Sequence, residues 1–249
     1  HYVDGTRLPS TPLSETGRRE LVSRACETFR RLFGMPSLST VAPCYLWDDE
    51  VEQIWSEHGI RYIQTAGYRC PSRDAAGYYI QDLHLIRPGQ RNRHGQISLV
   101  RNAMYEPVDG RGVEDCYREA HQAHRQGLPV VISTHRYNFT RSEEEYHDSL
   151  AGLDRLPDLL EAYDPSIRYL SSPELGAWMA DEAAPLADPA TNRHWPPLTR
   201  PEGLQKLRSF LFRLWYRHRK LRLLAIASGL ILPLGLITMP GWLRFRRSI

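Results

Sequence analysis

The sequence predicts an α/β fold with a parallel sheet and a separate C-terminal membrane helix, and three observations support this. Residues 39–64 show a strand, loop, helix, strand rhythm, which is typical of parallel sheets. Residues 130–133 form an apolar run that predicts a buried strand leading to His135. Residues 223–243 contain no charged residue, which separates the C-terminal part from the rest. We therefore expect an α/β domain over residues 1–181, a linker over 182–204 with five prolines, and a tail over 205–249.

Local signals assign the elements of this domain. Ser14 predicts the start of a helix over residues 14–33, and Gly34 with Pro36 predicts its end. A strand at 39–42, a helix from Asp48 closed by Gly59, and a strand at 60–64 follow. Between 66 and 102 only residues 96–100 predict a strand, so we expect a functional loop or lid there. Further elements are helices at 113–125, at 150–163 and from Ser172, and strands at 130–133 and 167–170.

Composition restricts the class of partner and the role of the cysteines. The chain has 32 basic and 29 acidic residues, and a net charge of +3 is too small to indicate a nucleic-acid partner. The four cysteines include no C-x-x-C pair, which argues against a zinc ribbon or a disulfide scaffold. We expect buried or free thiols.

The tail carries the signature of a membrane element. As a helix, residues 223–243 would measure about 31 Å, close to the apolar thickness of a bilayer. The glycines and prolines inside it leave a buried hairpin or a kinked interfacial helix as alternatives. Residues 210–222 alternate apolar and cationic side chains, as in a helix on anionic lipid, or in a solvated linker helix. We expect residues 205–249 to contact membrane lipid, with the positive-inside bias favouring a cytoplasmic main domain.

Polar side chains gather where three predicted strands end, and these are the candidate substrate and catalytic residues. Functional groups of parallel sheets lie at the carboxyl ends of the strands. The group comprises Pro43, Cys44 and Tyr45; Arg101, Asn102 and Glu106; and His135, Arg136 and Asn138. Histidine suits acid–base catalysis near neutral pH, and arginine suits an anionic or polyhydroxyl substrate. The alternative is that these residues anchor loops and that His135 is a structural, hydrogen-bonded group.

A candidate metal site lies at the first residues of the chain. His1 and Asp4 stand three residues apart and could share a metal ion or a hydrogen bond. Two solvated polar side chains are the alternative.

Several segments together resemble a known family. They are residues 1–5, 33–36, 42–45, 59–63, 89–96, 100–107, 132–138 and 169–176. In these segments the chain is similar to the polysaccharide deacetylase superfamily of carbohydrate esterases, in particular its exopolysaccharide-associated branch. The resemblance spans about residues 1–180 and implies an incomplete or irregular (β/α)-barrel.

The family implies a mechanism for this chain. Its members hydrolyse N-acetyl or O-acetyl groups of sugars, typically with a divalent metal, which we expect to be zinc. By this resemblance His1 corresponds to a metal ligand and His135 to the late histidine acid. Pro43, Cys44 and Tyr45 correspond to a groove wall that lends a backbone donor to the oxyanion. The chain departs from the family at Ala42, where an arginine is usual. The base aspartate and first metal ligand would precede His1, so either an N-terminal segment is missing or the activity is degenerate.

Two functions are therefore expected. One is a metal-dependent hydrolase of the bacterial inner membrane that removes acetyl groups from a polysaccharide or a lipid-linked glycan. The alternative is a catalytically inactive carbohydrate-binding protein of the same fold that acts in membrane-associated polysaccharide assembly or export.

Overall fold

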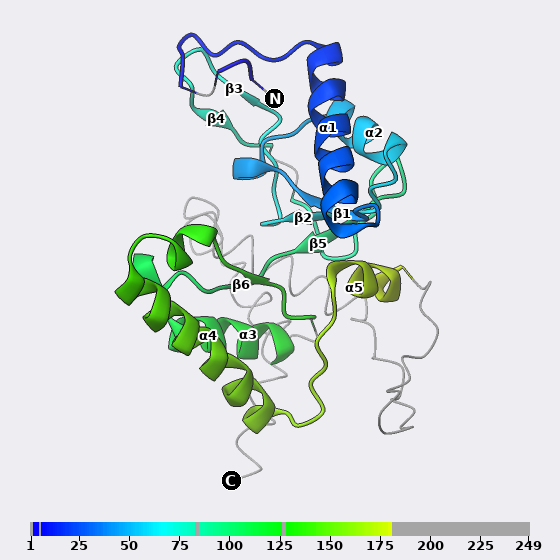
Figure 1. Cartoon of the computed structure of the whole chain (residues 1–249). Coiled ribbons are helices and arrows are strands. Elements are labelled where there is room, and N and C mark those ends of the chain that lie inside the picture. Colours follow the sequence, from blue (N-terminus) through cyan, green and yellow to red (C-terminus); the bar gives the residue numbers. More distant parts are fainter. Residues whose placement is uncertain (1, 5, 83–84, 126–127, 181–249) are drawn as a thin grey trace, which may run out of the picture. The chain divides into compact units, whose positions relative to one another are not determined.

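The computed structural model describes residues 2–4, 6–82, 85–125 and 128–180 (Figure 1). They divide into two compact units, the first from residues 1–101 and the segment beginning at Ser166, the second Asn102–Pro165. The fold is mixed α/β with parallel sheets, as expected, and the described residues close no barrel. The expected linker at 182–204 and tail at 205–249 lie outside the described residues. Within the described ranges, no helix combines the length and the apolar character needed to cross a membrane.

A three-stranded parallel sheet organises the first unit. Its order is β1 (Ser39–Val41), β2 (Tyr62–Thr65) and β5 (Ile97–Val100). Every residue of β5 is buried, as in a strand covered on both faces. Helix α5 (Ser172–Met179) packs on this sheet. Its backbone at Gly176 lies so close to the Tyr62 ring that an added Cβ atom would come within 2.2 Å of the ring. A glycine is therefore needed where α5 lies over β2.

Helices α1 (Glu15–Phe33) and α2 (Asp49–Glu57) begin and end as the sequence predicts. The Ser14 side chain accepts the Gly17 N–H, and Gly34 ends α1 in the left-handed conformation. The Asp48 side chain caps α2 in the same way. The apolar core between these helices and the sheet contains Val22, Ala42, Trp47, Val51, Ile54, Trp55, Ile60 and Ile63.

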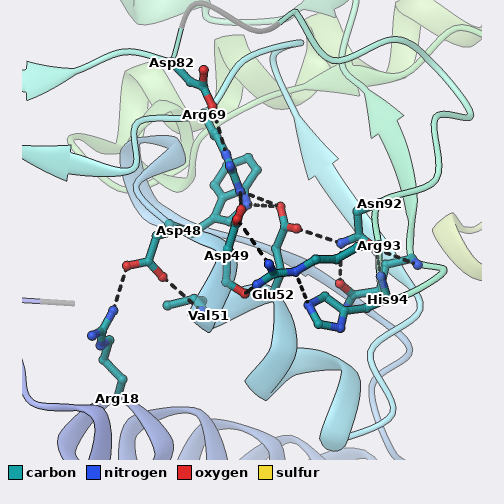
Figure 2. A network of polar contacts seen from close by, with 12 residues as sticks. Arg18, Asp48, Asp49, Val51, Glu52, Arg69, Asp82, Asn92, Arg93 and His94 are labelled. Atoms are coloured by element: carbon teal, nitrogen blue, oxygen red, sulfur yellow. Dashed lines mark hydrogen bonds and ion pairs between the residues drawn. The ribbon is translucent and has the colours of Figure 1, made fainter.

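A buried carboxylate braces the loops of the first unit (Figure 2). Glu52 of α2 accepts hydrogen bonds from Trp47 Nε1 at 2.9 Å, Arg69 at 3.1 Å and Asn92 Nδ2 at 2.9 Å. Arg69 also pairs with Asp82 at 3.3 Å. Glu52 thus connects α2 to the two irregular loops that contain Arg69 and Asn92. The Arg69 guanidinium compensates the negative charge of the buried carboxylate.

The loop region expected at 66–102 contains a hairpin that was not predicted from the sequence. Strands β3 (Ser72–Arg73) and β4 (Tyr79–Ile80) pair antiparallel across a turn. Each strand has two residues, too short for an alternating pattern to be recognised.

The second unit contains two parallel strands and two long helices. Strands β6 (Ala103–Met104) and β7 (Ile132–Ser133) pair with each other. Helices α3 (Val113–Arg125) and α4 (Glu143–Tyr163) pack beside them, and the Tyr105 hydroxyl donates to the Ser149 carbonyl of α4 at 2.6 Å. The short 3-10 helices η2 (Pro107–Asp109) and η3 (Arg136–Phe139) follow the two strands.

Three local predictions between residues 130 and 170 are wrong. The run at 130–133 is not a buried strand: only two of its residues are in β7, and Ile132 is 37% exposed. Residues 167–170 are in no strand. Helix α4 begins at Glu143 rather than at residue 150, because Ser142 caps it through the Glu145 N–H. An apolar run alone fixed neither the burial nor the length of a strand.

Candidate functional site

The geometry of the candidate site follows from the register of β6 and β7. Met104 pairs with Ser133, and the strands run parallel. Glu106 and His135 each lie two residues beyond this pair, so both side chains emerge at the same sheet edge. The Tyr105 N–H donates to the Ser133 carbonyl at 2.8 Å, which continues the pairing toward the site.

Glu106 and His135 form a carboxylate–histidine pair. Glu106 is 2% exposed, and its Oε1 lies 2.6 Å from His135 Nδ1. The imidazole side chain is 55% exposed. A carboxylate at Nδ1 favours the tautomer with its hydrogen on Nδ1 and so leaves the lone pair on Nε2. The pair can therefore deliver or accept a proton at Nε2, the arrangement used by acid–base histidines.

Asn138 fixes the second oxygen of the carboxylate. Its Nδ2 donates to Glu106 Oε2 at 2.5 Å and to the His135 carbonyl at 2.9 Å, and its Oδ1 accepts the Val108 N–H at 3.3 Å. Asn138 has no exposed surface. It therefore joins η2 to η3 and leaves Glu106 a single orientation.

Tyr137 confines the histidine ring from one side. The two rings are stacked, with centroids 5.8 Å apart and an interplanar angle of 22°. The Tyr137 hydroxyl donates to the Asp109 carboxylate, and this hydrogen bond raises the pKa of Tyr137 to about 12. Tyr137 and Asp109 were missed from sequence. Because Asp109 follows Glu106 and Tyr137 follows His135 within a few residues, their position in the sequence could have indicated that they belong to the site.

The strands that carry the pair are themselves braced. The Asn102 side chain donates to the Pro129 carbonyl at 2.9 Å and accepts the Val131 N–H at 2.8 Å. Glu119 of α3 accepts the Met104 N–H at 2.9 Å and pairs with Arg111. Asn102 thus positions the start of β7.

Of the other residues of the second unit that were predicted to bind substrate, one is exposed and two are buried. Arg136 is exposed in η3, where a substrate could reach it. Glu106 and Asn138 were predicted as substrate-binding residues, but both are buried and are engaged in holding His135. Their geometry assigns them as positioning residues.

The other predicted residues belong to the first unit. Arg101 lies against Gln64, with its Nε 3.3 Å from Gln64 Oε1. Pro43, Cys44 and Tyr45 form the 3-10 helix η1, in which Cys44 and Tyr45 have positive φ angles of 52° and 55°. The Tyr45 N–H donates to the Ala42 carbonyl at 3.0 Å, so this amide is already used within the turn.

The expected metal site is not assembled by the described residues. Asp4 accepts the Thr6 N–H and hydroxyl, both at 2.8 Å, and the backbone hydrogen bond from Thr6 lowers the pKa of Asp4. His1 lies outside the described residues. Within the described ranges, no three histidine, cysteine, aspartate or glutamate side chains form a group able to hold a metal. The zinc site stays a prediction.

Comparison of the chain with protein-family models, with curated proteins and with solved structures finds no match.

Proposed function

We propose that this protein removes acetyl groups from a bacterial polysaccharide or a lipid-linked glycan, with His135 as the acid–base residue. The observation that carries the proposal is the buried Glu106 carboxylate at 2.6 Å from Nδ1 of an exposed histidine. The resemblance of the chain to polysaccharide deacetylases supplies the substrate class, and with it the fold type, the metal and the membrane location. All of these are part of the proposal.

The chemistry that the pair supplies is proton transfer to the leaving group. In deacetylation, water adds to the acetyl carbonyl and gives up one proton to the solvent, and the C–N or C–O bond to the sugar breaks while the leaving nitrogen or oxygen takes a proton. Protonated His135 would donate that proton from Nε2. Glu106 would stabilise the imidazolium and keep its plane fixed by the bond at Nδ1. Exposed Arg136 would contact sugar hydroxyls or an anionic substituent.

Acetate release tests the proposal. The full chain and the His135→Ala variant are incubated with an N-acetylated or O-acetylated oligosaccharide, with and without added Zn²⁺. We expect the variant to be slower by about 10²–10⁴-fold, the usual contribution of a general acid. The His147→Ala variant, altered at an exposed histidine of α4, serves as the control and should keep the wild-type rate. Equal rates in wild type and His135→Ala would contradict the proposal.

A further inference from the structure

Two of the cysteines of the first unit lie on segments whose backbones are paired with each other. Leu46, which directly follows η1, forms a parallel bridge with Cys70. The Cys70 N–H donates to the Tyr45 carbonyl at 2.8 Å, and the Trp47 N–H donates to the Cys70 carbonyl at 3.0 Å. Cys44 lies in η1, two residues before the bridge. The backbone therefore brings the turn that contains Cys44 against the segment that contains Cys70.

The side chain of Tyr79, in β4, joins the two thiols. Its hydrogen bond with the Cys44 side chain raises the pKa of Tyr79, and burial and the charge of an ionised Cys70 raise it further. Burial, and then the charge of an ionised Cys44, raise the pKa of Cys70. Each of the three groups therefore interacts with the other two, and together they form one cluster.

The turn at Cys44 has an unusual backbone conformation. Cys44 and Tyr45 have φ angles of 52° and 55°, and neither residue is a glycine. Two consecutive residues of this kind are costly, and such conformations occur mainly at functional sites, where the surrounding structure holds them. The buried side chains of Ala42 and Trp47 fix the two ends of this turn in the core. The fold therefore holds Cys44 in place at the surface.

The two thiols differ in their access to solvent. Cys44 is exposed, whereas Cys70 is only 4% exposed, and both are free thiols in this structure. A dissolved oxidant can therefore meet Cys44 directly, while Cys70 is shielded from it. An accessible cysteine next to a second one that can react with its oxidised form is the arrangement of a redox-sensitive pair.

We propose that Cys44 and Cys70 are a site of reversible oxidation, at which a peroxide converts the two thiols into a disulfide. The Cys44 thiolate attacks one oxygen of hydrogen peroxide, the O–O bond breaks, and a sulfenic acid and hydroxide form. The Cys70 sulfur then attacks the Cys44 sulfur, and the S–O bond breaks. The two leaving oxygens take the two thiol protons and depart as water, so the thiols lose two electrons and the peroxide gains them.

The disulfide would change the first unit locally. The Cys44 sulfur exchanges its contact with Tyr79 for a covalent bond to Cys70, which fixes η1 to the segment after Arg69. The proposal does not rest on the proposed function, because both cysteines belong to the first unit and His135 belongs to the second.

Peptide mapping by mass spectrometry tests the pair. The reduced full chain is treated with a small excess of hydrogen peroxide, the remaining thiols are alkylated in denaturant, and the protein is digested with trypsin. Cleavage after Arg61 and Arg69 separates the two cysteines, so a disulfide joins two different peptides. We expect loss of both free thiols and a linked pair of peptides that dithiothreitol separates.

Three variants assign the steps, and circular dichroism checks that each is folded. Cys44→Ser removes the accessible thiol, so Cys70 should stay reduced. Cys70→Ser removes the second thiol, so the reaction should stop at a Cys44 sulfenic acid, which dimedone traps. Cys26→Ser is the matched control, since Cys26 is a half-buried thiol of α1, and it should give the same linked peptides as the wild type.

The products decide between the proposal and its alternatives. A reducible Cys44–Cys70 link in the wild type and in Cys26→Ser supports the pair. Cys44 oxidised to a sulfinic acid while Cys70 stays reduced would overturn it. A disulfide between the Cys44 residues of two copies, or oxidation of Cys70 in Cys44→Ser at the wild-type rate, would also overturn it.

Discussion

Glu106 and His135 meet at 2.6 Å because each lies two residues beyond a paired position of neighbouring parallel strands. The buried partner is the carboxylate, and the exposed partner is the imidazole. This division of roles leads to separate predictions for the two residues and for their supports.

Replacing Glu106 by glutamine should lower kcat by about 10–100-fold, the usual effect of losing a partner that orients a functional histidine. The KM should stay unchanged, since Glu106 is buried and cannot touch a substrate. Steady-state kinetics of acetate release measure both constants. Glu114→Gln, at an exposed position of α3, is the control. A rise in KM with kcat unchanged would mean that Glu106 acts in binding rather than in positioning.

Removing Asn138 should destabilise the second unit. Asn138→Ala leaves one oxygen of buried Glu106 without its donor and leaves the Val108 N–H without its acceptor. We expect a loss of about 1–3 kcal/mol in the free energy of unfolding, measured by urea denaturation. Asn138→Asp should be worse, because it places a second carboxylate against Glu106. Wild-type stability of both variants would show that Asn138 does not brace Glu106.

Gly176→Ala should destabilise the first unit by about 2 kcal/mol or more, since the added Cβ would lie 2.2 Å from the Tyr62 ring. Gly112→Ala is the matched control, because no atom lies within 4 Å of its added Cβ. Thermal unfolding of both variants measures the difference. Similar melting temperatures for the two would show that α5 does not pack on β2.

The cysteines should differ in reactivity. Cys44 is exposed, whereas Cys116 is buried and burial raises its pKa to about 12. Because the thiolate is the reactive form, Cys44 should be modified first by a thiol reagent at pH 8, and Cys116 only after unfolding. Peptide mass spectrometry after short and long exposure identifies the order. Early modification of Cys116 would contradict the burial of this residue of α3.

His121 should make the second unit acid-sensitive. Its ring lies 4.4 Å from the Tyr163 ring, and burial, then Arg125 and His124, lower the pKa of His121. The unfolded chain keeps the ordinary pKa of about 6.5 and therefore binds the proton first. Stability should fall as the pH drops from about 6.5 to the lower pKa of the folded state. His121→Gln should flatten this part of the stability curve, measured by urea denaturation at several pH values.

Local signals predicted helix boundaries well, because a cap depends on residues close in the chain. Ser14 and Gly34 bound α1 as expected. Local signals failed for residues 167–170, where the segment Ile167-Arg168-Tyr169-Leu170 forms no strand. Strand formation needs a partner elsewhere in the chain, and the sequence does not identify that partner.

The candidate site was predicted in part for a comparable reason. The rule that parallel strands share a functional edge placed Glu106 and His135 together, and the structure gives them a direct contact. The rule did not predict that Glu106 is buried, because its burial depends on how η2 and η3 pack around the carboxylate. The contact of Tyr137 with Asp109 depends on the same closure.

The equal offset of Glu106 and His135 from Met104 and Ser133 makes chain length as important as residue identity. Side chains alternate between the faces of a strand, so deleting Thr134 would turn the imidazole away from Glu106 although both residues remain. Insertions or deletions between a strand and its functional residue should therefore be as damaging as substitutions at the site.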